Sequence, residues 1–531
     1  MRINKRIVGS IAVLLAIGIS AVCINYSSGA RSQLEKSAGT QPLTPALQTG
    51  DPLAGIDAGF TADASFTSHL PIVIIDTNNE RPPVTTRLLE EEERYVTLEG
   101  VEPYVNGKIC VIDNEGGLNS LGDEATSTHL IRLKRRGNSS MSYEKAQYLL
   151  KTVTESGQDS MTALLDMPAE CEWVLNGSMV DKSMMRNYLV YRIASEFMPY
   201  SPRARYCEVI YREEGNYMYE GVYLLIESVK QGENRVDIPE YKVNDLFPSY
   251  IVRRDRFDET DIMLNTYATV NQLSSKHIGL IYPGKRSVTD RMVQYVEEDI
   301  SKIERVLYSD DDSVFSTYLR YIDVDSFIDY FLLNECFGSY DAGWHSTYMY
   351  KAAGGKLKIG PVWDLDNALD NYIKEPLQIE VTAFQTSPWF DRLMRDATFL
   401  SKMEKRYAEL RSGPLSDKNI LQTIKAIEDH LGSAIDREWA RWAHYHETTN
   451  QYSLLPYIDE DGDELQRNTN EFRQEIYRLS TAVPQHAKAV APRLNLLQLS
   501  TVTRTGWFGR MDVVFVAALL LFIVTCFTVR R

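Results

Sequence analysis

The order of hydrophobic patterns along the chain constrains its fold more than any other feature. Short apolar and β-branched runs recur up to residue 253 and predict buried strands; they are 69–75, 108–112, 130–134, 147–153, 206–211, 221–226 and 249–253. Helical patterns cover 181–197 and 289–308, begin again at Asp323 or Asp325, and dominate from Pro388 to about Trp442. Strands early and helices late predict an α+β fold with a helical C-terminal lobe.

Two uncharged hydrophobic stretches, residues 7–24 and 513–529, lie near the ends of the sequence. Each is close to the minimum of about 17 residues that a membrane-crossing helix needs. Arg2, Lys5 and Arg6 precede the first stretch, so we expect this end to stay in the cytoplasm and the middle of the chain to be exported. Residues 1–25 are either a cleaved signal peptide or an anchor, and 511–529 are expected to form a transmembrane helix.

Composition divides the remaining chain into further segments. Residues 26–66 are rich in Ser, Gly, Ala, Thr and Pro, which predicts a flexible linker. We expect a strand-rich region over 67–130, the main domain over 131–440 and a helical extension over 441–506. The formal net charge of −16 argues against a nucleic-acid partner, because phosphates attract basic surfaces. We therefore expect a protein of the cell membrane whose main domain lies on the extracytoplasmic side.

The chemistry is concentrated between residues 334 and 371. Asp341 lies on a predicted loop, 347–351 and 356–362 read as two strands around a Gly354-Gly355 turn, and Asp364 and Asp366 follow the second strand. A hairpin of this kind brings the acids before and after it close together. Carboxylates suit Mg²⁺, which phosphoryl transfer requires, and Asp341 is placed to accept a hydroxyl proton. Without further support, Asp364 and Asp366 are more typical of turn chemistry than of a metal site.

Four segments resemble a known family and occur in its order. They are 136–140 followed by Lys145, then 181–187, 221–227 and 363–366. Together they resemble the spore-coat-H (CotH) kinase family. The resemblance implies an atypical, two-lobed protein-kinase-like fold. It also implies phosphorylation of protein Ser or Thr hydroxyls with ATP and Mg²⁺ or Mn²⁺. It implies Asp341 as catalytic base and Asp364 as metal ligand, and carboxylate chemistry adds Asp366 as a second ligand.

A looser analogy with the family extends to the nucleotide. It implies that Lys145 or Lys151 contacts ATP phosphates, with Arg136 nearby and Glu227 as a possible partner of the lysine. Taken singly, each of these residues is more typical of a solvated strand charge or a structural ion pair. The fifth residue after the expected base is Ser346, where many relatives carry Asn, and a hydroxyl is a weaker metal ligand.

Ser346 leaves a second function open. A catalytically degenerate member would act as a surface adhesin or an assembly scaffold rather than as an enzyme. For an active enzyme, a glycan or wall polymer is an alternative acceptor to a protein, and the sequence does not separate these acceptors.

Overall fold

The computed structural model describes residues 43–46, 50–89, 94–114, 117–137, 139–256, 261–274, 276–372, 376, 386–448, 457–458, 462, 464–465 and 467–497. The hydrophobic stretches 7–24 and 513–529 lie outside the described residues. Among the residues that the structure describes, no helix has both the length and the apolar character needed to cross a bilayer. The chain divides into two compact units. The first comprises 1–240, 360–363 and 422–445; the second comprises 241–359, 364–421 and 446–531.

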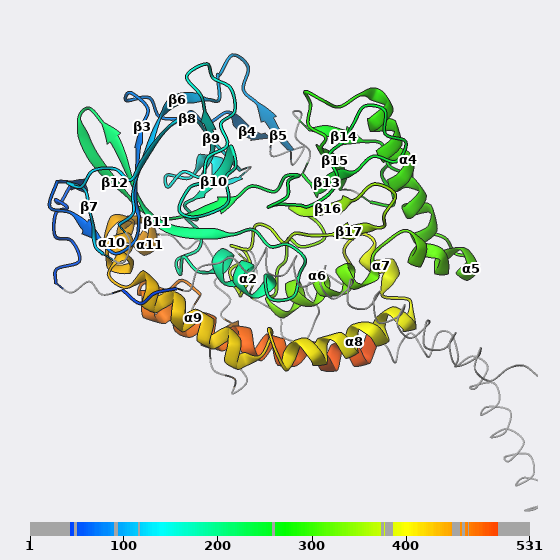
Figure 1. Cartoon of the computed structure of the whole chain (residues 1–531). Helices are drawn as coiled ribbons and strands as arrows, with labels where there is room; N and C mark the ends of the chain where they lie inside the picture. Colours follow the sequence, from blue (N-terminus) through cyan, green and yellow to red (C-terminus); the bar gives the residue numbers. More distant parts are fainter. Residues whose placement is uncertain are drawn as a thin grey trace, which may run out of the picture. The chain divides into compact units, whose positions relative to one another are not determined.

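The first unit is built around one sheet of eight strands in the order β1-β12-β10-β9-β8-β6-β3-β11 (Figure 1). Its strands are β1 Thr61–Ala62, β3 Ile72–Asp76, β6 Val105–Ile112, β8 Ser127–Arg135, β9 Tyr148–Val153, β10 Glu172–Asn176, β11 Ala204–Glu213 and β12 Asn216–Glu227. Because β12 pairs with β10 as well as with β11, all strands except β1 form a closed ring. Only β3 and β11 run parallel to each other. Each strand predicted for this part of the chain is present.

Alternation of side chains gives this sheet its core. Along β3, Val73 and Ile75 point to the same side, and they share a buried cluster with Ile109, Leu133 and Trp173 from three other strands. The opposite face packs a second, smaller buried cluster that includes Phe66. The β-branched and aromatic runs of the sequence therefore form strands because both faces of the sheet are covered.

The structure divides the N-terminal part differently from the sequence analysis. The expected linker, 26–66, has described residues at 43–46 and 50–66, and within them β1 pairs with β12 and Phe66 is fully buried. The boundary expected at 130/131 falls inside β8, which pairs with β6 on one side and β9 on the other. Strand pairing thus joins the expected strand-rich region, 67–130, and the start of the expected main domain, 131–440, in one sheet.

One predicted helix is shorter than its pattern. The 181–197 pattern yields α2 Arg186–Ala194. Asp181 explains the late start, because its side chain accepts hydrogen bonds from the backbone N–H groups of Ser183 and Arg186 at 3.1 and 2.9 Å. Met184 has a φ of 62°, which no helix accommodates. The remaining elements of this unit are β2 Thr67–Ser68, β4 Thr86–Leu89, β5 Arg94–Thr97, β7 Asn119–Ser120, the 3₁₀ helix η2 Ser139–Ser142 and α10 Ala434–Arg441.

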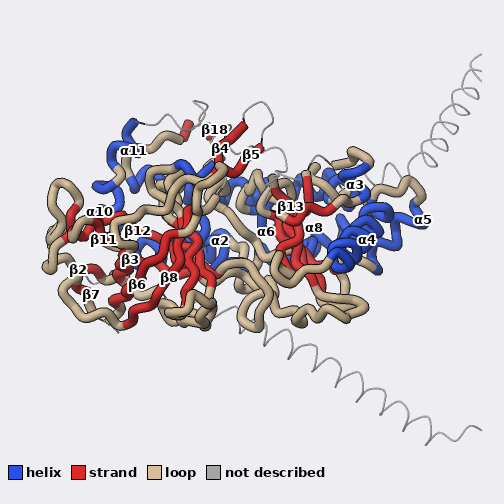
Figure 2. Tube along the Cα trace, turned by 90° about the horizontal axis from the view of Figure 1, so that it is seen from above, coloured by secondary structure: helices blue, strands red, loops and turns tan. Residues whose placement is uncertain are grey.

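The second unit contains a five-stranded sheet in the order β14-β15-β13-β16-β17. Its strands are β13 Tyr250–Asp255, β14 Ile262–Leu264, β15 His277–Tyr282, β16 Thr347–Lys351 and β17 Leu357–Ile359. Figure 2 shows these strands in red with helix α4 in blue beside them. The helix predicted over 289–308 is confirmed as α4 Asp290–Leu307, which Thr289 caps by accepting from the backbone N–H of Met292.

The second unit contains several helices. They are α3 Tyr267–Val270, α5 Asp312–Phe315, η3 Ser316–Arg320, α6 Val324–Cys336, α7 Phe390–Leu393 and α8 Ala397–Arg411. Helix α9 Asp417–Leu431 and α11 Ala443–Thr448 cross the division between the units, and β18 Tyr457–Ile458 pairs with β19 Glu464–Leu465. Helix α6 is capped by Asp323, which is one of the two residues predicted to start it.

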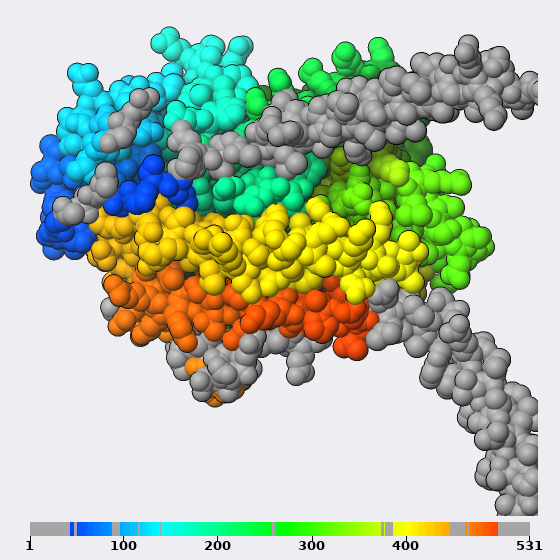
Figure 3. All heavy atoms as spheres, turned by 60° about the horizontal axis from the view of Figure 1, so that its bottom comes forward, coloured from blue at the N-terminus to red at the C-terminus, as the bar shows by residue number. Residues whose placement is uncertain are grey.

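Residues 472–497 form a long helix that runs beside α8 (Figure 3, orange-red beside yellow). The hydroxyl of Tyr407 on α8 donates a hydrogen bond to the carbonyl of Ala487 at 2.5 Å and ties the two helices together. The coarse fold prediction, an α+β protein with strands early and helices late, is confirmed.

Candidate active site

The hairpin predicted before the acidic residues is present. Strand β16 pairs antiparallel with β17, with Met349 opposite Ile359, and Gly354 makes the turn with a φ of 67°. Antiparallel pairing returns the chain after β17 toward the start of β16. The carboxylate of Asp364 consequently accepts a hydrogen bond from the hydroxyl of Ser346 at 3.1 Å.

Asp341 reaches the same site from the other side. It follows α6 and Gly338, whose φ of 56° directs the chain away from the helix axis. The side-chain amide of Asn367 donates to the Asp341 carboxylate at 2.7 Å. Asn367 is the third residue after Asp364, so the segments that carry the two acids meet through this hydrogen bond.

The electrostatics of the two acids are unfavourable without a cation. Burial raises the pKa of Asp341, and the negative charge of Asp364 raises it further, while the Asn367 hydrogen bond and Arg256 act in the opposite direction. Among the residues that the structure describes, neither carboxylate forms an ion pair. Half-buried acids that repel each other in this way are typical of functional sites, where a bound ion or a proton relieves the repulsion.

Backbone strain coincides with the same residues. Ser346 has a φ of 48° and Asp364 a φ of 64°, both in the left-handed region that side-chain-bearing residues rarely occupy. Each such residue costs of the order of 1 kcal/mol or more and persists only where the surroundings impose it. The strain lies at the hydrogen bond between Ser346 and Asp364, as expected if their geometry serves a function.

The sequence reasoning missed three residues near Asp341. Asn367 was not considered, although it directly follows Asp366. Asp255 and Arg256 were missed because only the pairing of β13 with β16, Arg254 opposite Thr347, brings the end of β13 to this site. Asp255 lies 3.8 Å from the Nδ1 atom of His345.

His345 lies between α6 and β16, and its surroundings keep it uncharged. Burial lowers the pKa of His345 to about 4, and the charges of Arg256 and Lys276 contribute, against the opposing effect of Asp255. The imidazole is therefore neutral at pH 7. Arg256 and Lys276 place positive charge in the neighbourhood of the site.

Asp366, predicted as a second metal ligand, lies buried next to these groups. Its backbone carbonyl accepts a hydrogen bond from the side-chain amide of Asn371 at 2.6 Å. Its metal-binding role stays a prediction.

The donor chemistry fits a hard divalent cation. Asp341, Asp364, Ser346 and Asn367 offer only oxygen ligands, which Mg²⁺ prefers, and Mg²⁺ commonly takes one or two carboxylates and completes its shell with phosphate and water. No group of three or more His, Cys, Asp or Glu residues within the described ranges is arranged as a self-sufficient metal site. Two carboxylates beside a hydroxyl and an amide oxygen suit a metal that also takes phosphate oxygens as ligands.

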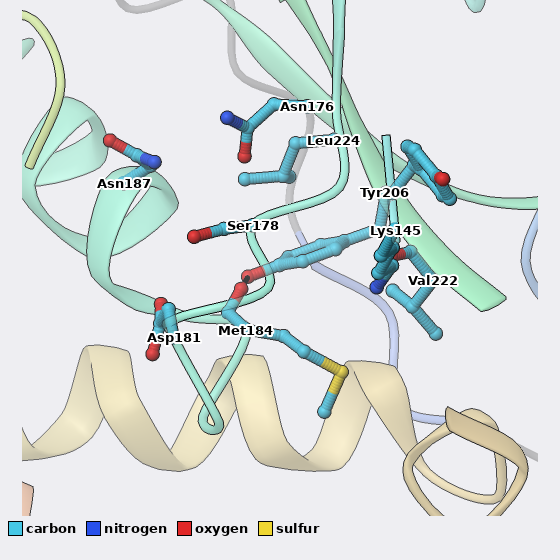
Figure 4. A pocket seen from close by; sticks show the side chains of 10 residues that line it. Lys145, Asn176, Ser178, Asp181, Met184, Asn187, Tyr206, Val222 and Leu224 are labelled. Carbon is cyan, nitrogen blue, oxygen red and sulfur yellow. Dashed lines mark hydrogen bonds between the residues drawn. The ribbon is translucent and has the colours of Figure 1, made fainter. Parts of the chain in front are cut away.

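Lys145, expected to contact ATP phosphates, is buried in the first unit. Its ammonium lies 2.5 Å from Glu438 of α10 and donates to the carbonyl of Val222 at 2.8 Å. Burial lowers the pKa of Lys145 and raises that of Glu438, and the attraction between them offsets part of both shifts. Lys145 and Val222 line one side of a cavity of about 10 Å³, with Asp181 and Ser178 across it (Figure 4). This volume holds about one water molecule.

Glu227 is not the partner of Lys145. Its fully buried carboxylate binds two arginines, Arg203 at 2.5 Å and Arg235, and accepts from the hydroxyl of Tyr200 at 3.1 Å. The sequence did not reveal this pairing because both arginines come from segments with no pattern that links them to Glu227.

The other two residues expected at the nucleotide also have partners in the first unit. Lys151 pairs with Glu172 across β9 and β10 at 2.9 Å, a half-exposed cross-strand ion pair. Arg136 lies over the ring of Trp363, 5.4 Å from its centre. All four residues expected at the nucleotide belong to the first unit: Arg136, Lys145, Lys151 and Glu227. The second unit contains Asp341, Ser346, Asp364 and Asp366.

Comparison with known proteins identifies the family of the chain. The model of a family described as CotH kinase protein matches residues 133–485, well over half of the 531 residues. The matched span contains every residue predicted for the site. No curated protein matches the chain. This chain belongs to the CotH kinase protein family and is kinase-like.

Proposed function

We propose that this protein transfers the γ-phosphate of ATP to Ser or Thr hydroxyls of an exported or surface protein. The observation that carries the proposal is the pair Asp341 and Asp364, two carboxylates without an ion-pair partner among the described residues, joined through Asn367. Membership of the CotH kinase protein family supports it, since kinase-like families generally depend on ATP and a divalent metal. An atypical two-lobed kinase fold is part of the proposal.

The roles of the acids follow from their surroundings. Asp364, assisted by Asp366, would hold Mg²⁺ or Mn²⁺, and the ion when bound neutralises charge on the phosphates. Asp341 accepts the proton of the substrate hydroxyl. Its raised pKa makes it a better base than an ordinary Asp, and the amide of Asn367 holds its carboxylate in one orientation.

The resemblance to the CotH kinases extends the proposal to the nucleotide. Lys145 is assigned to the ATP phosphates, with Glu438 in the partner role first expected for Glu227. Lys151 and Arg136 remain weaker candidates, because each has a partner of its own in this unit.

The proposal also includes a location. The hydrophobic stretches 7–24 and 513–529 support a protein tethered to the cell membrane with its body on the extracytoplasmic side.

A phosphotransfer assay on the purified full-length protein tests the function. With Mg²⁺ and labelled ATP, the wild type should label itself or a basic test protein, and Asp364→Ala should reduce the rate by about 10³-fold or more, because metal and base act as a unit. Asp325→Ala is the matched control, since this acid lies exposed on α6 beside Lys402. Equal labelling by wild type and Asp364→Ala would overturn the proposal.

One observation favours a second candidate, a degenerate surface adhesin or scaffold. Ser346 replaces the expected Asn, and its hydroxyl is directed to Asp364. Thermal unfolding with ATP separates the two functions: an active site is stabilised by ATP only with Mg²⁺ or Mn²⁺ present. Nucleotide binding without turnover would favour a degenerate kinase, and no nucleotide effect would favour adhesion.

A further inference from the structure

The turn that follows Asp364 is strained. Leu369 and Asp370 have φ values of 56° and 58°, and both side chains are fully buried. Two consecutive left-handed residues that are not glycine each cost roughly 1–2 kcal/mol. Contacts from elsewhere must hold this turn in place.

Those contacts come from residues 467–497, here called the C-terminal segment. Arg478 binds the Asp370 carboxylate at 3.0 Å and also donates to its backbone carbonyl. Arg467 lies 3.3 Å from the other carboxylate oxygen. Glu475 accepts from Arg478 at 2.8 Å and fixes the guanidinium from the opposite side. All four side chains are at most 2 % exposed.

Arg478 also reaches the acids of the site through one residue. Its guanidinium donates to the Asn371 side-chain carbonyl at 3.2 Å. The amide group of Asn371 donates in turn to the backbone carbonyl of Asp366 at 2.6 Å. Asp366 is two residues after Asp364, so Asn371 transmits the position of Arg478 to the acidic segment.

The same C-terminal segment contacts the segment that leads to Asp341. The Nε2 atom of His486 lies 2.7 Å from the backbone carbonyl of Glu335, at the end of α6. The N–H of Leu369, in the strained turn, donates to the carbonyl of Phe337 at 2.7 Å. The strained turn, the end of α6 and the C-terminal segment therefore form one connected hydrogen-bond network.

We propose that the C-terminal segment is part of the active site's framework and that Arg478 and Asn371 are positioning residues for Asp364 and Asp366. The inference rests on the proposed function. A site of this kind must be held to within about 0.5 Å by residues that are themselves fixed. A buried ion pair alone is weak evidence for stability, whereas a satisfied network ending at the acidic segment matches a requirement for precise placement.

Hydrogen exchange of the full-length protein, combined with kinetics, tests the inference. Asn371→Ala breaks the relay without leaving a buried charge unpaired. We expect the amides of 364–372 to exchange about 10-fold faster and kcat to fall by about 10–100-fold, because small misplacements of reacting groups are costly. The KM for ATP should change less than kcat.

Tyr407→Phe is the matched control. It removes the hydrogen bond from α8 to Ala487 and the contact of the same hydroxyl with Cys336. The strained turn and the contacts from Arg478 through Asn371 to Asp366 stay intact. Exchange of 364–372 and kcat should stay within about 2-fold of the wild type. Equal effects of the two variants on kcat and exchange would overturn the proposal, as would wild-type exchange in Asn371→Ala.

A second variant covers the case in which Asn371→Ala does not fold. Arg478→Lys keeps a positive charge between Asp370 and Glu475 but cannot bind Asn371 at the same time, and the same exchange and kcat changes are expected. If the wild type shows no phosphotransfer, the proposed function fails. Hydrogen exchange of 364–372 still decides separately whether the C-terminal segment positions the acids.

Discussion

Glu227 in the first unit is fully buried and Asp341 in the second is half-buried, and their surroundings are opposite. Glu227 receives two arginine guanidinium groups, a tyrosine hydroxyl and a backbone N–H. Asp341 receives one amide hydrogen bond, from Asn367, and experiences the repulsion of Asp364.

This is the difference that we expect between a structural acid and a functional one. Fully compensated charges, such as Glu227 and the Glu208–Arg437 pair, fix strands and helices in place and leave nothing for a ligand to neutralise. Uncompensated carboxylates cost folding free energy and are retained where an ion or a proton is to be bound. Both acids were predicted as site residues from the sequence, and only their partners distinguish them.

The largest expected effect is at Asp341. Asp341→Asn should lower the phosphotransfer rate by about 10³-fold or more, because an amide cannot accept the substrate proton. The variant should nevertheless fold at least as stably as the wild type. Rates and urea midpoints of the two proteins at pH 7.5 give the comparison.

The pH dependence of stability has a definite sign for Asp341. Its folded-state pKa is raised, so its contribution to stability is present below the ordinary Asp pKa of about 3.9 and is lost as pH rises through the raised value. Without divalent metal, the stability advantage of Asp341→Asn should therefore grow from pH 4 upward. A constant difference over this range would contradict the uncompensated state of Asp341.

The next largest effect is at Glu227. Glu227→Gln leaves Arg203 and Arg235 buried with a neutral partner, and the free energy of unfolding should fall by about 3–5 kcal/mol. Glu172→Gln, which affects the half-exposed pair with Lys151, should cost about 0–1 kcal/mol. If Glu227→Gln kept its stability but raised the KM for ATP, Glu227 would belong with the functional acids.

Lys145 and Glu438 test whether a compensated pair also serves the nucleotide. Lys145→Met leaves the buried Glu438 carboxylate without its counter-charge and should lower the free energy of unfolding by about 3 kcal/mol. Adding Glu438→Gln in a double variant should restore most of this loss. If Lys145 contacts phosphates, the KM for ATP stays raised at least 10-fold in the double variant. A KM that returns to the wild-type value would make the pair purely structural.

The smallest effect is expected at Ser346. Asn tolerates a left-handed backbone better than Ser, so Ser346→Asn should stabilise the protein by about 0.5 kcal/mol at its φ of 48°. The amide oxygen is also a better metal ligand, and the Mg²⁺ concentration for half-maximal activity should fall a few-fold. Thermal midpoints and Mg²⁺ titrations measure the two effects. A higher Mg²⁺ requirement in Ser346→Asn would show that the Ser346–Asp364 hydrogen bond contributes more to Mg²⁺ binding than the amide oxygen does.

Sequence periodicity alone predicted strands β3, β6, β8, β9, β11, β12 and β13, the helices α4 and α6 and the hairpin before Asp364, because each depends on neighbours a few residues apart. It did not predict β10 or β15. The closed ring of strands was not predictable, since the pairing of β12 with both β10 and β11 joins segments that no local pattern relates.

Residue chemistry in the sequence identified the acids, and tertiary structure decided their partners. Asp341, Asp364 and Lys145 stand out by type and spacing, whereas Glu438 and Arg478 lie 293 and 108 residues from the groups they bind. Charge compensation depends on distance in space and on burial, which the order of residues does not encode locally. For this reason the sequence predicted which acids form the candidate site, and only the fold showed which charges are neutralised by neighbouring side chains and which are not.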